Sequence, residues 1–132
     1  MDLPPTQFVA PITPVAQVQV VDPMFSTSSV IYMLWGKEQG DKMIKIFTCE
    51  SGMKQWADYD TEWSKKGEPL MSSTTDIGIA QIHIGKSTDW LERSKELGYD
   101  LTKTVDNLDM AYYIWNIQGF GAWSCSKKVG IV

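Results

Sequence analysis

Apolar residues recur at helical spacing soon after the first 25 residues of the chain. Gly40 follows the last of them, and Ser28 and Ser29 precede them as candidate caps. A spacing of three and four places side chains on one face of an α-helix. The sequence therefore predicts a helix from about 28 to 40. Its apolar face holds Val30, Ile31, Leu34 and Trp35.

A second helix is predicted over 42–51, with Asp41 as its cap. Its apolar positions follow the order i, i+3, i+4 and i+7, and the last of them is a glutamate, Glu50. A carboxylate on the apolar face of a helix end is unusual, because an unpaired charge is costly to bury. The four residues are Met43, Ile46, Phe47 and Glu50.

Residues 52–80 are rich in Gly, Ser, Thr, Asp and Trp and contain a short β-prone piece at 77–79. This composition predicts an irregular loop with a small hairpin. Asp89 and Glu92 have the spacing of a capping box, so a helix is predicted over 89–97, ended by Gly98.

A last main helix is predicted to begin at Thr104 or Asp106 and to end at Gly119. Its apolar stripe comprises Leu108, Ala111, Tyr112 and Trp115. Helices thus outnumber strands, and the predicted fold class is α+β, mainly helical, with a small hairpin after the helix that carries Glu50.

Five of the six prolines lie within residues 1–25. Proline favours extended backbone in the residue before it, so this stretch is predicted to be a linker or an arm over the domain surface. Residues 26–132 then form one domain, which we expect to be a monomer. The N-terminus lacks the basic and apolar regions of a signal peptide, so an exported protein would have lost its leader.

The net charge of −4 argues against nucleic acid as a partner. It also gives the protein no long-range attraction to an anionic cell wall. No segment is apolar enough to span a bilayer, so no membrane insertion is expected.

The chain has two cysteines and one histidine. These do not make a convincing zinc site, so we expect no metal and no cofactor. The two cysteines form either one disulfide, as in an oxidising compartment, or two buried thiols. Spacing alone does not decide between these alternatives.

Glu50 meets the requirement of a general acid in glycoside cleavage. The departing oxygen needs a proton, and a carboxylic acid keeps one near neutral pH only if burial disfavours its charged form. The position of Glu50 on an apolar helix face, beside a loop that contains Trp56 and Trp63, fits this condition. The alternative is a partly exposed glutamate that pairs with a lysine such as Lys54.

Four motifs resemble the lysozyme superfamily in the right order. Cys-Glu-Ser-Gly at 49–52 resembles the Glu-Ser-Gly motif of lytic transglycosylases, and Thr-Asp-Ile-Gly-Ile-Ala-Gln-Ile at 75–82 resembles a strand of animal lysozymes. Asn-Leu at 107–108 is similar to the family's Asn-Ile. Residues 118–125, with Trp123 and Cys125, resemble the ending of resuscitation-promoting factors. The resemblance covers about 40–126.

The resemblance implies a role for each matching residue. Glu50 matches the general acid, whose pKa is raised by an apolar pocket in hen lysozyme. Gly78 matches a glycine that lets the strand pass close to the sugar, and Gln81 a glutamine that orders the strand and cleft. Cys49 and Cys125 match a disulfide.

The family tyrosine of the last helix has no clean match in this chain. Trp115 takes its position in the alignment of the motifs, and Tyr112 and Tyr113 lie nearby. Tyr113 is the candidate for substrate binding that the resemblance leaves.

Asp76 matches the second carboxylate of animal lysozymes, which lytic transglycosylases usually lack. The alternative is a turn residue that caps the hairpin backbone. His83 is interpreted as a strand-end residue. The aromatic residues in or beside the predicted cleft loops are candidates for stacking on sugar rings, and they are Trp56, Trp63, Tyr59 and Trp90.

The resemblance therefore implies a secreted, periplasmic or wall-associated muramidase that cuts the β-1,4 bond between MurNAc and GlcNAc of peptidoglycan strands. A lytic transglycosylase is the first interpretation, and a hydrolytic lysozyme that uses Glu50 and Asp76 is the alternative. A glycan-binding or wall-attachment module without activity, or an assembly protein of a phage or secretion apparatus, also fits the sequence.

Overall fold

The computed structural model describes residues 23–131, with side chains from residue 27. The arm predicted over 1–25 lies outside this range except for its last three residues, which begin the first helix. The elements follow in the order α1 (Pro23–Ser51), β1 (Met71–Ser73), β2 (Asp76–Ile77), β3 (Ile82–His83), α2 (Trp90–Leu97), α3 (Thr104–Gln118), η3 (Gly119–Ala122) and α4 (Cys125–Lys128). The predicted α+β class with mainly helical content is confirmed.

The helix α1 consists of two helical segments that meet at Gly36. Gly36 has φ +80° and ψ 176°, a backbone conformation that glycine adopts at little cost. The predicted break at Gly40 and the predicted caps at Ser28 and Ser29 are therefore wrong. The helix begins at Pro23, and proline suits a first turn because its missing N–H has no helical partner there.

Gly40 serves to bring the two segments of α1 together. It is buried, and a Cβ at this position would lie 2.7 Å from Cδ1 of Tyr32. The Tyr32 hydroxyl donates to Asp41 at 2.6 Å, and the Lys37 ammonium lies 2.7 Å from the same carboxylate. Asp41 thus links the two segments, and it does not cap a separate helix.

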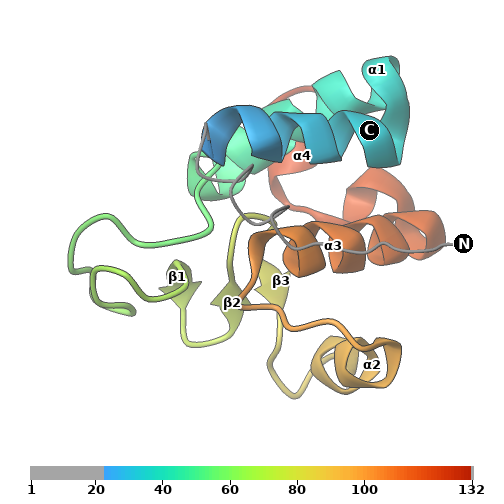
Figure 1. Cartoon of the computed structure of the whole chain (residues 1–132). Coiled ribbons are helices and arrows are strands. Elements are labelled where there is room, and N and C mark those ends of the chain that lie inside the picture. The colour runs from blue at the N-terminus through green and yellow to red at the C-terminus, as the bar shows by residue number, and fades with distance from the viewer. Residues whose placement is uncertain (1–22, 132) are drawn as a thin grey trace, which may run out of the picture.

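The three short strands form one antiparallel sheet in the order β1-β2-β3. Asp76 pairs with His83 and Ile77 with Ile82, so Asp76 and His83 are direct cross-strand neighbours. The long loop over 52–70 precedes the sheet. In Figure 1 the helices α1, α3 and α4 lie together, while the loop and the sheet form a second part beside them.

The predicted start of α3 at Thr104 and the predicted ends of α2 and α3 are confirmed, whereas the predicted cap of α2 is not. Gly98 and Gly119 end the two helices with positive φ, as predicted. Asp89 stands at the N-cap of α2, but its side chain makes no cap hydrogen bond, so the predicted capping box is wrong. Its carboxylate instead lies 3.8 Å from the Arg93 guanidinium.

The core fills the space between α1, α3 and the sheet. Leu108 and Ala111 of the predicted stripe are fully buried, whereas Tyr112 and Trp115 are partly buried against the ring of Trp35. The largest fully buried apolar side chains are Phe47, Ile31, Met43, Ile46, Ile79, Leu108 and Met110.

A disulfide joins Cys49 near the end of α1 to Cys125 at the start of α4, with a Cα–Cα distance of 6.0 Å. The predicted pairing is confirmed, and the alternative of two free thiols is wrong. None of the helices in the described part of the chain has the length and apolar content needed to cross a membrane.

Candidate active site

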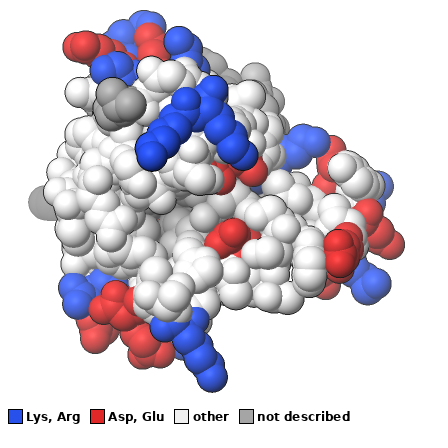
Figure 2. Space-filling model, turned by 180° about the vertical axis from the view of Figure 1, so that it is seen from behind, with Lys and Arg blue, Asp and Glu red and all other residues white. Residues whose placement is uncertain are grey.

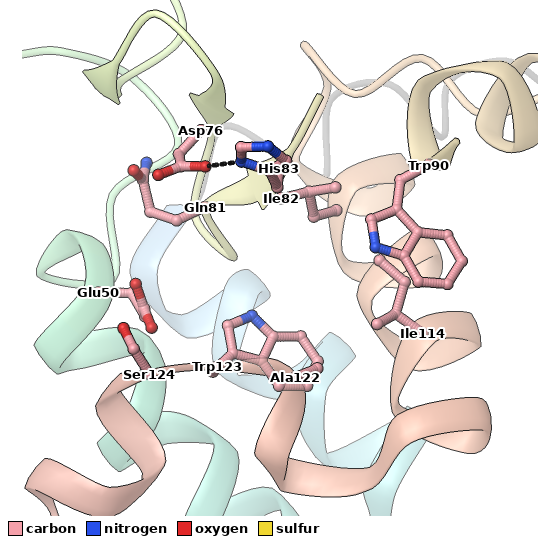
Figure 3. A pocket seen from close by; sticks show the side chains of 10 residues that line it. All are labelled: Glu50, Asp76, Gln81, Ile82, His83, Trp90, Ile114, Ala122, Trp123 and Ser124. Carbon is pink, nitrogen blue, oxygen red and sulfur yellow. Dashed lines mark hydrogen bonds and ion pairs between the residues drawn. The ribbon is translucent and has the colours of Figure 1, made fainter. Parts of the chain in front are cut away.

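A cavity of about 200 Å³ lies where the helices meet the sheet. Figure 3 shows that Glu50 reaches it from α1, and that Asp76, Gln81 and His83 reach it from the sheet and its turn. The structure therefore brings both predicted carboxylates to one cavity. The complete lining is Glu50, Asp76, Gln81, Ile82, His83, Trp90, Ile114, Ala122, Trp123 and Ser124.

Glu50 is half-buried and is held by the segment that the disulfide ties to α1. The backbone N–H of Cys125 donates to Glu50 Oε2 at 3.2 Å. Lys54 instead pairs with Asp58 at 2.7 Å. The alternative of a surface glutamate paired with Lys54 is therefore wrong.

The pKa of Glu50 is raised above its ordinary value. Burial is the largest cause, and the negative charge of Asp76 acts in the same direction. The N–H of Cys125 and the charge of Lys128 lower the pKa without reversing the shift. Glu50 thus keeps its proton to a higher pH than an exposed glutamate does, as a general acid requires.

One face of the molecule has a hollow with charged side chains of both signs near it (Figure 2). Figure 2 shows a hollow near the centre of the face behind that of Figure 1, with acidic atoms in it and basic side chains at its rim. This arrangement agrees with a lining that contains Glu50 and Asp76 and with the effect of Lys128 on Glu50.

Replacing Lys128 with Gln is expected to raise the pKa of Glu50, because one of the two effects that lower it is lost. A general acid works below its pKa, so the alkaline limb of any Glu50-dependent activity moves to higher pH. A pH–rate profile measures the shift. Lys127→Gln is the matched control, and equal profiles for the two variants would contradict the assignment.

Asp76 does not cap the hairpin backbone. Its Oδ1 lies 2.9 Å from His83 Nδ1, and its Oδ2 lies 3.5 Å from the Ser73 hydroxyl. Ser73 itself caps the turn, since its Oγ accepts from the backbone N–H of Thr75 at 3.2 Å. The turn-cap alternative for Asp76 is therefore wrong, and its carboxylate lines the cavity.

Gln81 lines the cavity and holds the turn that precedes β3. Its Nε2 donates to the carbonyl oxygens of Gly78 at 2.8 Å and Leu70 at 3.2 Å, which orders the turn before β3. Within the described residues its Oε1 has no hydrogen-bond partner, although the side chain is only 8% exposed. A buried acceptor without a partner costs stability.

Gly78 does not line the cavity. It has φ +78°, and a Cβ at this position would lie 2.3 Å from Asn107 Nδ2 and 2.8 Å from Gln55 Oε1. Asn107 at the start of α3 donates to the Ile77 carbonyl and accepts from the Ala80 N–H, so it fixes the turn after β2. The absence of a side chain at Gly78 lets Asn107 of α3 pack against the turn after β2. This packing explains the glycine without a bound sugar.

Gly78→Ala is expected to lower the free energy of unfolding by roughly 2–5 kcal/mol, since it adds a strained φ to a steric clash. Gly67→Ala separates the two effects. Gly67 also has a positive φ, but nothing lies within 4 Å of its Cβ position, so only the conformational cost remains. Urea unfolding measures both variants, and equal losses would contradict the role given to Asn107.

The aromatic candidates separate into two groups. Trp90 lines the cavity, and so does Trp123, whose Nε1–H donates to the Ala80 carbonyl at 2.8 Å. Trp56, Trp63 and Tyr59 are exposed on the loop 52–70 and do not line it. Their exposure agrees with loop surface, and their predicted stacking on sugar is not supported by a place in the cavity.

Tyr113 also lies outside the lining of the cavity. Its hydroxyl accepts from Arg93 Nη1 at 2.8 Å, so it joins α3 to α2. The substrate-binding role that the sequence suggests for Tyr113 therefore has no geometric support. The cause is its position on α3, where Ile114 takes the cavity face.

Five residues that line the cavity were not predicted from the sequence as site residues. They are Ile82, His83, Ile114, Ala122 and Ser124. His83 ends β3 as predicted, but its place at the cavity follows from its cross-strand pairing with Asp76, which the sequence alone does not show. Ala122 and Ser124 flank Trp123 in the chain. For Ile82 and Ile114, the sequence does not show whether an isoleucine lines a cavity or packs in the core.

Comparison with protein-family models, with curated proteins and with solved structures finds no match to this chain. Between Pro23 and Ile131, no group of three or more His, Cys, Asp or Glu side chains could hold a metal ion. A function for this chain is therefore inferred from the cavity and from the chemistry of its residues.

Proposed function

We propose that this protein is a muramidase that cuts the β-1,4 bond between MurNAc and GlcNAc, with Glu50 as the general acid. The observation that carries the proposal is a half-buried glutamate with a raised pKa that shares one cavity with a second carboxylate. Two carboxyl groups whose environments differ are the machinery of glycoside cleavage.

The arrangement of elements supports a lysozyme-like fold. A glutamate at a helix end, a small antiparallel sheet after it and an asparagine at the start of the next helix meet around one cavity. The motifs that resemble the superfamily lie at these same points. The disulfide agrees with an oxidising compartment, so we also propose that the protein acts outside the cytoplasm.

In the proposed reaction Glu50 gives its proton to the leaving glycosidic oxygen, and positive charge develops on the sugar ring. Asp76 stabilises that charge, either as an ion or as a nucleophile. Its place in the cavity favours the hydrolytic lysozyme over the transglycosylase, in which the 6-hydroxyl of the sugar attacks. Trp90 and Trp123 supply apolar wall, and Gln81 holds the turn that borders the cavity.

A panel of β-1,4-linked polymers tests this proposal. The purified protein is incubated with peptidoglycan sacculi, chitin and cellulose, and soluble sugar is measured over time. We expect release from sacculi and much less from cellulose, which has no acetamido groups. Release from none of the three between pH 4 and pH 8 would refute the enzymatic function.

A glycan-binding module without turnover is the second candidate, favoured by the exposed aromatic side chains on the loop 52–70. Trp56 is 45% exposed, Trp63 44% and Tyr59 66%. Exposed aromatic rings of this kind can stack on sugars. This candidate predicts binding to sacculi that Trp56→Ala and Trp63→Ala weaken and that replacement of Glu50 leaves unchanged.

A further inference from the structure

Asp76, His83 and Ser87 form a chain of hydrogen bonds at the edge of the cavity. His83 Nδ1 lies 2.9 Å from Asp76 Oδ1, and His83 Nε2 lies 2.8 Å from the Ser87 hydroxyl. Figure 3 shows the bond between Asp76 and His83 on the sheet side of the cavity. Both ring nitrogens are therefore engaged, which fixes the orientation of the imidazole.

The loop after β3 is shaped around the imidazole ring. A Cβ at Gly85 would lie 2.9 Å from His83 Nε2 and 3.0 Å from Thr75 Cγ2, so only glycine fits there without movement. The Thr88 hydroxyl donates to the His83 carbonyl at 3.0 Å, and this bond holds the loop that presents Ser87. These contacts indicate a built site for the ring.

This hydrogen-bond chain can be kept in both protonation states of the histidine. In the neutral ring, Nδ1–H donates to Asp76 and Nε2 accepts from the Ser87 hydroxyl. In the charged ring both nitrogens donate, and the hydroxyl oxygen of Ser87 accepts. Protonation therefore changes the charge beside Asp76 without requiring the ring to move.

We infer that His83 is a positioning residue that orients Asp76 and controls, through its own protonation, how much negative charge Asp76 presents to the substrate. This role rests on the proposed function and deepens it. With the neutral ring, Asp76 carries a full charge toward a developing oxocarbenium ion. With the imidazolium, the pair is neutral overall, and the stabilisation of that ion weakens.

Few other charged groups bear on His83. Glu50 lies across the same cavity. On the following loop and α2, Lys86 is exposed, Asp89 faces Arg93, and Arg93 also contacts Glu96 and the Tyr113 hydroxyl. Among the described side chains, Asp76 is the only charged one with an ion pair to His83.

The effect of pH on activity has a definite sign. Histidine is the side chain whose charge commonly changes between pH 5 and 8. The proposed catalysis needs the neutral ring, so a variant whose side chain cannot carry a charge at position 83 is expected to keep a larger share of its activity at acid pH than the wild type does.

The test compares pH–rate profiles on purified sacculi for the wild type and His83→Asn, with His83→Gln as a second variant. Both amides keep a donor for Asp76 and do not titrate. We expect the ratio of the rate at pH 4.5 to the rate at the optimum of the wild type to rise by at least about fivefold in either variant. A purely structural loss would lower the rate equally at every pH.

Nuclear magnetic resonance gives an independent measurement, because His83 is the single histidine of the chain. The signals of its ring are expected to change with pH over the range in which the amide variants gain relative activity. Active variants whose ratio of rates is unchanged, or ring signals that do not change over that range, overturn the inference and leave the muramidase standing. Failure of the wild type to cleave sacculi at any pH overturns both.

Discussion

Replacing Glu50 with Gln is expected to reduce cleavage of peptidoglycan by roughly 10²–10⁴-fold, because general acid catalysis contributes about that factor. Glutamine has nearly the same shape, and its carbonyl oxygen can still accept from the Cys125 N–H. It has no proton to give to the leaving oxygen. Initial rates on sacculi measure the loss, and Glu92→Gln on the exposed surface of α2 is the matched control.

The same variant is expected to be more stable than the wild type at neutral pH. The pKa of Glu50 is raised in the folded state, so the folded protein holds the proton more tightly than the unfolded chain. This contribution to stability is fully present below the unfolded pKa and is lost as pH rises through the folded pKa. Glutamine avoids the loss.

Thermal unfolding at pH 4 and pH 8 checks this sign. The difference in Tm between Glu50→Gln and the wild type is expected to favour the variant at pH 8 and to shrink at pH 4. A loss of activity together with a loss of stability at pH 8 would indicate a structural role for Glu50. Such a result is the opposite of the trade-off expected at an active site.

Removing the disulfide is expected to have a large effect on stability. The bond joins residues 76 positions apart, and the chain-entropy model gives about 4 kcal/mol for a loop of this length. The variant Cys49→Ala, Cys125→Ala should unfold at a clearly lower guanidinium concentration. Activity should fall as well if α4 shifts, since the backbone N–H of residue 125 holds Glu50 and the disulfide ties α4 to α1.

Reduced wild-type protein is the control for this variant, and the two should unfold together. A difference below about 1 kcal/mol between the oxidised wild type and the double variant would contradict the expectation. Loss of stability without loss of activity would show that α4 keeps its place beside Glu50 without the bond.

Local features of the fold can be predicted from the sequence more reliably than contacts between distant segments. Gly98 and Gly119 end helices because a glycine after an apolar run adopts positive φ easily. Gly36 and Gly40 look alike in sequence, yet only the packing of Tyr32 distinguishes the buried glycine from the one at the bend. No apolar side chain lies between Trp35 and Met43, so the apolar pattern does not decide between them.

The candidate site shows the same limit. Glu50, Asp76 and Gln81 can be predicted because motifs surround them, and the structure brings all three to one cavity. The motif assigns Gly78 to the sugar, although the side chain that this glycine accommodates belongs to Asn107, 29 positions later in the chain. The role of His83 is not visible in the sequence, because its bonds to Asp76 and to the following loop depend on strand register and loop shape.

Mass spectrometry of the fragments released from purified sacculi tests most directly whether Glu50 drives cleavage of the glycan. We expect soluble disaccharide-peptides cut after MurNAc, with reducing ends from water, and their absence from a Glu50→Gln digest. Fragments with anhydro ends would still be consistent with Glu50 as the acid. They would show that the sugar's own 6-hydroxyl attacks, in place of the hydrolysis in which Asp76 takes part. Intact sacculi, or fragments cut only at peptide bonds, would contradict the proposed muramidase.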